Sequence, residues 1–271
     1  MMTRSDINRE TVKAWRLATA PLRRIPDFLI PGAPKCGTSS LYDLIALHPH
    51  VRRGWRKEPT NFIHYPTSHL RSRMNQPFAR GSFVCGEGSV EYFFHPDAPF
   101  HAANIVPRAK LIFLLRDPVA RAWSEYRMFV RSGHEKEDFG FVVRRAMRWL
   151  SDPDARPLCE AASRASFNPV RYVRCGMYAE LIERWPFPRE QVLISFAEDL
   201  FERPQEVARS VYSFLGLPDH EPDSFPHARD SGNRSMPPVD VVAELREFYA
   251  PHDARLRGFL GRELPWENAQ T

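Results

Sequence analysis

Cysteine and long apolar runs are scarce in this sequence of 271 residues. Its four cysteines (Cys36, Cys85, Cys159 and Cys175) are widely spaced and form no C-x-x-C pair. This spacing indicates neither a zinc site nor a disulfide-built secreted scaffold. No apolar run approaches the roughly 18 residues that a membrane-spanning helix needs, and the N-terminus has no signal-peptide core. We therefore expect free thiols in a reducing compartment and no transmembrane segment.

Internal repeats, long linkers and a strong excess of one charge are also missing. The formal net charge is only +5, and the excess is mostly Arg, which suits bidentate binding of phosphate or sulfate. The chain has no zinc-finger spacing and no basic helix with heptads, so we expect no nucleic-acid partner. A hydrophobic content of 43% supports a packed core rather than a disordered tail. Together these features favour a single α/β domain that binds a polyanionic ligand.

One stretch, residues 28–41, organises the rest of the chain. Apolar residues lead into a loop of Pro, Gly and Ala that carries Lys35, and Gly37-Thr38-Ser39-Ser40 then opens an apolar pattern at helical spacing. The first N–H groups of a helix lack internal partners, and the helix dipole adds positive charge there. The pattern predicts a cradle for a phosphate or sulfate ester. An ordinary strand-to-helix turn, with Thr or Ser as the cap, stays open at this point.

A second segment has a similar arrangement. Residues 110–116 place five apolar residues between two cations, which predicts a strand buried on both faces of a parallel sheet that helices cover. Asp117-Pro118 predicts the start of a helix that carries Ser124. Because ligands gather where parallel strands end, we expect Arg116 beside the Lys35 loop. The alternative for Arg116 is an ion pair with Asp117 or another local acid.

The remaining segments supply further expected elements. Strands are predicted at 27–30, 83–87 and 191–196, and helices at 139–150 and 204–215. Residues 52–62 are interpreted as a loop in which Glu58 is the single acid among several cations, which favour its ionised form. On composition alone, Glu58 is a salt-bridged surface residue. Pro238 and Pro251 are each expected to open a helix. Residues 1–25 are interpreted as an N-terminal extension with a weakly amphipathic helix that lies across its own domain, while contact with a membrane surface or a partner stays open.

Three segments, in this order and spacing, resemble sulfotransferases that use 3'-phosphoadenosine 5'-phosphosulfate (PAPS). They are PGAPKCGTSSLYDLIALHP, KLIFLLRDPVARAWSEY and Ser231–Pro237. The chain is most similar to bacterial relatives of the heparan sulfate and other carbohydrate sulfotransferases, over about Pro26 to Trp266. The resemblance implies a P-loop-kinase-like topology with a central parallel sheet, and a sulfotransferase domain at 26–268 after the extension at 1–25. It also implies a soluble, cytoplasmic enzyme.

The resemblance further implies roles for individual residues. Lys35 would stabilise charge on the bridging and leaving oxygens, and Glu58 would be the general base. Arg116 and Ser124 would bind the 3'-phosphate, and Arg234 would add a further contact. The 5'-phosphosulfate end would be held by Lys35, Cys36, Gly37, Thr38, Ser39 and Ser40. No metal is implied. The expected acceptor is a small molecule or glycan, with a carbohydrate hydroxyl favoured over a lipid, a natural product or an amine.

Two departures and two alternative functions accompany this interpretation. Gly88 follows Glu87 at a place where some heparan-type members have Lys, and Cys36 stands where a smaller residue is common. A P-loop nucleotide kinase or NTPase is one alternative, although its pattern places Lys after the second Gly, whereas Lys35 precedes Gly37. The other alternative is a non-enzymatic binder of sulfated glycans or other polyanions, whose affinity would fall steeply with salt.

Overall fold

The computed structural model describes residues 4–63, 68–155, 168, 170–225 and 236–267. Within them, the core is one parallel sheet of five strands in the order β2-β3-β1-β4-β5. The strands are β1 (Phe28–Gly32), β2 (Val51–Arg53), β3 (Val84–Gly88), β4 (Lys110–Leu115) and β5 (Val192–Phe196). The chain passes from β1 to β2 and β3 on one side and then returns to β4 on the other. The strand order therefore reverses at β1, which confirms the predicted P-loop-kinase-like topology.

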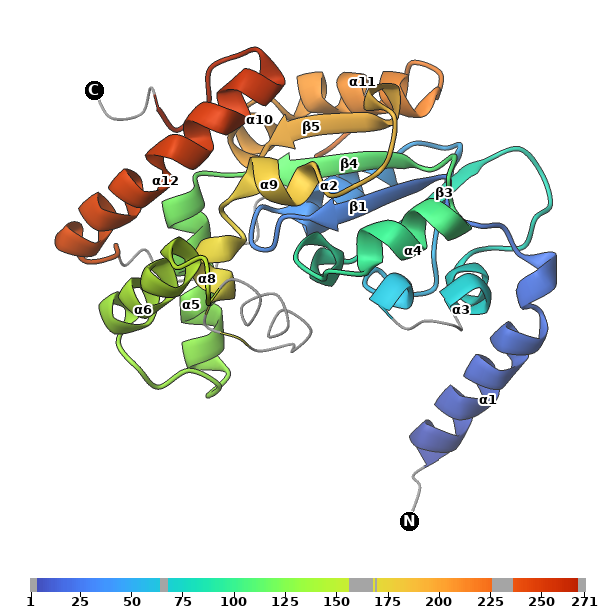
Figure 1. The fold of residues 1–271 in the computed structure, drawn as a ribbon. Coiled ribbons are helices and arrows are strands. Elements are labelled where there is room, and N and C mark those ends of the chain that lie inside the picture. Colours follow the sequence, from blue (N-terminus) through green and yellow to red (C-terminus); the bar gives the residue numbers. More distant parts are fainter. Residues whose placement is uncertain (1–3, 64–67, 156–167, 169, 226–235, 268–271) are drawn as a thin grey trace.

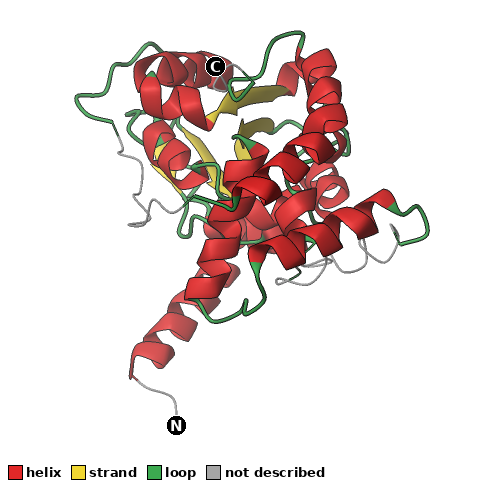
Figure 2. Cartoon of the chain, turned by 90° about the vertical axis from the view of Figure 1, so that its left-hand side faces the viewer, coloured by secondary structure: helices red, strands yellow, loops and turns green. Residues whose placement is uncertain are grey.

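Helices cover both faces of the sheet (Figures 1 and 2). α2 and α11 pack together on one face, and α4 lies on the other with α3 beside it (Figure 1). None of the described helices combines the length and apolar content needed to cross a membrane. These helices are α1 (Arg4–Ala18), α2 (Thr38–Ile45), α3 (Ser68–Asn75), α4 (Ala98–Ile105), α5 (Pro118–Arg131), α6 (Phe139–Ser151), α8 (Arg171–Arg174), α9 (Tyr178–Ile182), α10 (Ala197–Glu202), α11 (Pro204–Leu215) and α12 (Val239–Leu260).

The central strands are buried on both faces, as their apolar runs predict. Every residue of β1 is buried, and so are residues 111–115 of β4. β3 approaches β1 closely at Gly86, where a Cβ would lie 2.4 Å from the carbonyl oxygen of Phe28. A glycine at this position therefore allows the two strands to pair.

A second helical layer, made of α5, α6 and α8, lies beyond the carboxyl ends of the strands (Figure 1). The Asp117 carboxylate caps α5 by accepting from the backbone N–H of Val119 (2.9 Å) and Ala120 (3.4 Å), as the sequence predicts. Arg246 of α12 donates to both oxygens of the same carboxylate at 2.9 and 2.5 Å. This bidentate pair fixes the start of α5, directly after β4, against α12.

The structure differs from the sequence expectation at β2. Residues 51–53 pair with residues 84–86 of β3 instead of belonging to a loop. β2 is a short edge strand, and Arg52 and Arg53 are exposed, so the apolar alternation of a strand is missing. The Arg52 guanidinium lies 4.5 Å from the centre of the Phe83 ring, which covers part of this edge.

The structure also differs at Pro251, where one helix replaces the expected two. α12 continues through Pro251, although Pro has no backbone N–H to donate to the preceding turn. Packing on both sides holds the helix together. Before the proline, the Tyr249 hydroxyl donates to the carbonyl of Val173 (2.8 Å), and after it, Asp253 accepts from Trp266 Nε1 (3.1 Å).

α1 points away from the body of the protein rather than lying across it (Figure 1). Its last turns are attached where Arg16 donates to the carbonyl oxygens of Met74 (2.9 Å) and Gln76 (3.1 Å) at the end of α3. The exposed fraction is 52% at Trp15 and 46% at Leu17. The apolar residues of α1 are too few to cover a face of the domain, and the contacts named here attach its last turns.

The close approach of β3 to β1 gives a stability prediction. Gly86→Ala should lower the free energy of unfolding by about 2 kcal/mol, because a backbone oxygen must move to admit the methyl group. Gly258→Ala is the matched control, since a Cβ there meets nothing within 4 Å and α12 gains helix propensity. Urea unfolding of both variants measures the difference. Equal midpoints for Gly86→Ala and the unchanged chain would contradict the close strand contact.

Candidate active site

The loop between β1 and α2 places Lys35 at the carboxyl edge of the sheet. The backbone N–H of Ala33 donates to the carbonyl of Leu114 in β4 (2.8 Å), which fixes the loop against the neighbouring strand. Lys35 (φ 66°) and Gly37 (φ 90°) then adopt left-handed backbone conformations. For a residue other than glycine, this conformation costs about 1–3 kcal/mol and persists where the surroundings impose it. α2 begins directly afterwards at Thr38, so its first N–H groups point back toward the loop.

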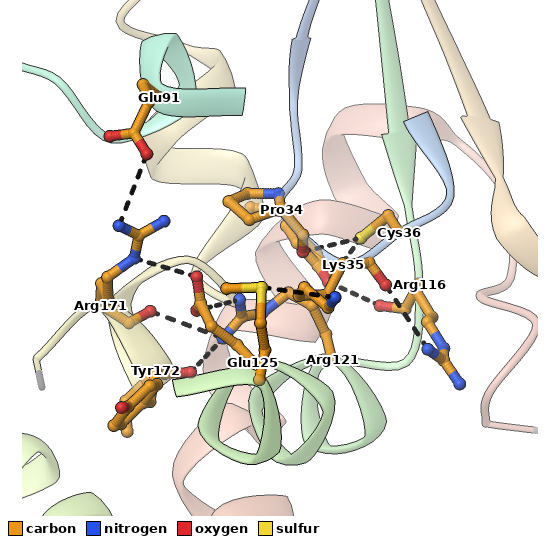
Figure 3. Close-up of polar contacts among 12 residues, drawn as sticks. Pro34, Lys35, Cys36, Glu91, Arg116, Arg121, Glu125, Arg171 and Tyr172 are labelled. Atoms are coloured by element: carbon orange, nitrogen blue, oxygen red, sulfur yellow. Dashed lines mark hydrogen bonds and ion pairs between the residues drawn. The ribbon is translucent and has the colours of Figure 1, made fainter. Parts of the chain in front are cut away.

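Lys35 lies between this loop and α5, with its Nζ 3.7 Å from the Met128 sulfur (Figure 3). Burial lowers the pKa of the Lys35 ammonium, Glu125 raises it, and three arginines lower it further. The arginines are Arg131, Arg116 and Arg121. The site therefore holds several cations close together, and a bound anion would relieve their mutual repulsion.

Arg116 follows β4 at the same edge as Lys35, as predicted. Its Nη1 is 3.5 Å from the carbonyl oxygen of Lys35, so the two predicted anion-binding segments are in contact (Figure 3). The backbone carbonyl of Arg116 accepts from the Tyr178 hydroxyl (2.7 Å), which holds the end of β4 in place. Asp117 pairs with Arg246 instead of Arg116. The Arg116 guanidinium therefore remains directed to the loop edge.

The predicted donor-binding residues differ in burial. Thr38 and Ser40 are buried, whereas Ser39 and, on α5, Ser124 are half-buried. Cys36 is buried with its Sγ 4.0 Å from the Tyr178 hydroxyl oxygen, and burial raises the pKa of its thiol to about 12. Its side chain thus faces the core.

Glu58 is joined to the Lys35 loop through Lys57. The Lys57 Nζ donates to Ser39 Oγ (2.6 Å) and to Glu58 Oε1 (2.8 Å). The Glu58 side chain is 43% exposed and that of Lys57 is 25% exposed. The structure therefore brings the predicted base to the start of α2. The same geometry also agrees with the alternative prediction that Glu58 is a salt-bridged surface residue.

A buried ion cluster of Arg121, Glu125 and Arg171 lies beneath Lys35 (Figure 3). Glu125 Oε2 is 2.7 Å from Arg121 Nη1, and Glu125 Oε1 is 2.9 Å from Arg171 Nε. Arg121 and Glu125 are fully buried, and Arg171 is 5% exposed. Arg121 also donates to the carbonyl of Tyr172, so the cluster joins α5 to α8. Arg234, the remaining predicted contact, lies outside the described residues.

Comparison with protein families identifies this chain. Residues 25–228, more than half of it, match the family model for the sulfotransferase domain. The chain belongs to the sulfotransferase family. The resemblance inferred from the Lys35 loop and the Arg116 segment is thereby confirmed at the level of the family.

Known relatives agree with this assignment. The sulfotransferase is 28% identical to mouse carbohydrate sulfotransferase 15 over 306 residues, which cover 89% of this chain and 54% of the relative. It is also 28% identical to human heparan sulfate glucosamine 3-O-sulfotransferase 6, covering 97% and 80% of the two chains. The chain thus spans about half the length of the first relative. The crystal structure of a sulfotransferase from Alicyclobacillus acidocaldarius superposes with a TM-score of 0.67 at 28% identity, covering 89% of this chain and 98% of that one.

Glu87 supports the Glu58 loop of the sulfotransferase, a role that the sequence did not reveal. Its fully buried carboxylate accepts from the Tyr92 hydroxyl (2.6 Å) and from Asn61 Nδ2 (3.0 Å). The neighbouring N–H of Gly88 donates to the carbonyl of Lys57 (3.1 Å). The end of β3 therefore anchors residues 57–61. The one available signal was an acid inside an otherwise buried strand.

Burial raises the pKa of Glu87 from its ordinary 4.5 to about 7. Between these two pKa values, Glu87 keeps its proton in the folded chain and has lost it in the unfolded chain. The contribution of Glu87 to stability is therefore fully present below about pH 4.5 and is lost as the pH rises to about 7. A shift of this size amounts to about 3 kcal/mol at most. Thermal unfolding between pH 5 and 8 should show a smaller loss of stability in Glu87→Gln than in the unchanged chain. Parallel pH profiles of the two proteins would contradict this assignment.

Proposed function

We propose that this sulfotransferase transfers a sulfuryl group from PAPS to an acceptor hydroxyl, with Glu58 as the base and carbohydrate as the favoured acceptor class. The observation that carries the proposal is the contact between the two anion-binding segments. Arg116 Nη1 lies 3.5 Å from the carbonyl oxygen of Lys35, so both segments lie side by side at one edge of the sheet. A nucleotide with phosphate groups at two positions matches two adjacent cationic sites better than a single anion does.

The residues present fit such a donor. The start of α2 offers backbone N–H groups and the hydroxyls of Thr38, Ser39 and Ser40, and Lys35 adds a full positive charge. We assign these groups to the 5'-phosphosulfate end. We assign the 3'-phosphate to Arg116, which directly follows β4, and to Ser124, which lies on α5. Arg234 keeps its proposed role as a further contact.

Sulfuryl transfer needs positioning and charge stabilisation more than covalent participation by the protein. The acceptor oxygen forms a bond to sulfur while the bond between sulfur and the bridging phosphate oxygen breaks. The electron pair of that bond stays with the phosphate, and the acceptor proton passes to Glu58. Lys35 stabilises the negative charge on the leaving oxygen. The products are the sulfated acceptor and 3'-phosphoadenosine 5'-phosphate.

The acceptor class rests on the relatives. The curated relatives reported above are a carbohydrate sulfotransferase and a heparan sulfate glucosamine 3-O-sulfotransferase by name. A glycan hydroxyl is therefore the first acceptor to test, with radiolabelled PAPS and heparan sulfate, chondroitin and a simple phenol as probes. Label in the phenol alone would move the assignment to small-molecule acceptors.

Donor selectivity is the direct test of the nucleotide assignment. Calorimetry should show that 3'-phosphoadenosine 5'-phosphate binds at least about tenfold more tightly than AMP or ATP, since only the bisphosphate engages both cationic sites. Equal affinity for the bisphosphate and AMP would remove PAPS as the donor. Tighter binding of ATP with magnesium would favour the kinase alternative. Binding of sulfated glycan alone, with steep salt dependence, would favour the non-enzymatic alternative.

Two substitutions separate charge stabilisation from proton transfer. Lys35→Ala should lower kcat by about 100-fold or more, because the leaving oxygen loses its cation. Glu58→Gln should lower kcat by a similar factor but leave the affinity for 3'-phosphoadenosine 5'-phosphate within about threefold, because an amide cannot take the acceptor proton. Turnover assays and calorimetry on the same preparations give both values. Normal turnover in Glu58→Gln would show that Glu58 is not the base.

A further inference from the structure

We propose that Lys57 is a second catalytic cation of this site, in addition to Lys35. The proposal rests on the sulfotransferase function proposed above and deepens it. Lys57 Nζ contacts both the proposed base and the donor loop, by which we mean the Lys35 loop and the start of α2. It donates to Ser39 Oγ of the donor loop at 2.6 Å and to Glu58 Oε1 at 2.8 Å.

The position of Lys57 is fixed from two directions. Its backbone carbonyl accepts from Gly88 N–H at the end of β3 (3.1 Å), and its ammonium reaches the start of α2. Gly88 has no side chain, and an added Cβ there would meet Ile30 Cβ at 3.4 Å. The backbone of Lys57 is therefore anchored at the end of β3, while its ammonium reaches the start of α2.

The hydrogen bonds leave donors available for a substrate. An ammonium has three N–H groups, and two of those of Lys57 point to Ser39 and Glu58. Ser39 accepts the bond from Lys57, so its own hydroxyl hydrogen is still free to be given to an anion. Lys57 and Ser39 together thus present donors toward the place assigned to the 5'-phosphosulfate end.

The change of charge during transfer gives Lys57 its role. Before the reaction, the Lys57 ammonium is neutralised by the Glu58 carboxylate. When Glu58 takes the acceptor proton, it becomes neutral and the ion pair loses its negative partner. At that same moment, negative charge develops on the oxygens of the leaving phosphate. The Lys57 cation, 2.6 Å from Ser39, is then available to stabilise these oxygens.

A surface ion pair is the simpler interpretation of the Lys57–Glu58 contact. Exposed pairs contribute about 0–1 kcal/mol, and removing one would leave kcat nearly unchanged. Two observations favour the catalytic role. Lys57 is only 25% exposed and has a second partner in the donor loop. Lysine is also scarce in this Arg-rich chain, yet of its five lysines one, Lys35, lies on the loop before α2 and a second, Lys57, contacts Ser39 at the start of that helix.

The test compares Lys57→Met, Lys57→Arg and the control Lys136→Met. Lys136 is an exposed lysine on the loop between α5 and α6 and has no assigned role. The assay is sulfuryl transfer to the acceptor found in the panel above, or release of labelled sulfate from PAPS to water if the panel yields none. Calorimetry with 3'-phosphoadenosine 5'-phosphate and thermal unfolding accompany each variant. Lys57→Gln replaces Lys57→Met if the latter does not fold.

We expect Lys57→Met to lower kcat by at least about 30-fold, with the affinity for the bisphosphate within about threefold and the Tm nearly unchanged. Lys57→Arg keeps the charge and should stay within about tenfold of the unchanged chain. Lys136→Met should match the unchanged chain. A kcat within threefold in Lys57→Met, an equal loss in Lys57→Arg, or a loss of bisphosphate affinity as large as the loss of kcat would each overturn the proposal. If the unchanged chain binds the bisphosphate no better than AMP, the proposed function itself has failed instead.

Discussion

The structure depends on the ion cluster of Arg121, Glu125 and Arg171. Removing these charges from water is costly, and only close pairing offsets the cost, so the three side chains tolerate little displacement. Glu125 is 2.7 Å from Arg121 and 2.9 Å from Arg171. Because two members are on α5 and the third begins α8, the cluster fixes how these helices meet. Interaction with Glu125 raises the pKa of Arg121 despite its burial, so its charge is retained.

The cluster also sets the position of the proposed donor site. α5 starts directly after β4, so its orientation determines where Arg116 and Ser124 lie relative to the Lys35 loop. The Asp117–Arg246 pair restrains the start of the same helix, since the Asp117 cap lies with its Oδ2 2.5 Å from Arg246 Nη2 of α12. α5 is therefore held at its beginning and in its middle, and one turn after Glu125 its Met128 sulfur lies 3.7 Å from Lys35 Nζ. The two predicted anion-binding segments therefore meet because α5 is held firmly against α8 and α12.

Some segments of the fold could be predicted from local sequence patterns alone. The apolar run of β4, the Asp117 cap and the Lys35 loop each combine residue types whose local chemistry gives one structure, so their order also yielded the fold. β2 was missed because an edge strand exposes its residues, and α12 was divided because tertiary packing overrides the break at Pro251. The contacts of Lys57 with Ser39, of Glu87 with Asn61 and of Glu125 with Arg171 were not predictable, since they join residues far apart in sequence through side chains whose burial only the fold decides. The placement of Lys35 and Arg116 at one edge followed from parallel topology, but their contact did not.

The charged residues around Lys35 matter both for the stability of the site and for its proposed chemistry. Lys35 lies among three arginines, and Glu125 is the buried acid that opposes them. Burial and these arginines lower the pKa of Lys35, so an anion bound here would relieve the repulsion among the cations. Both carboxylate oxygens of Glu125 are close to buried arginines, at 2.7 Å from Arg121 and 2.9 Å from Arg171. Glu58 is different: it is 43% exposed, and its charge is balanced by a lysine that is also partly exposed. The fold thus separates a buried acid that is paired with two arginines from the partly exposed acid that we propose as the base.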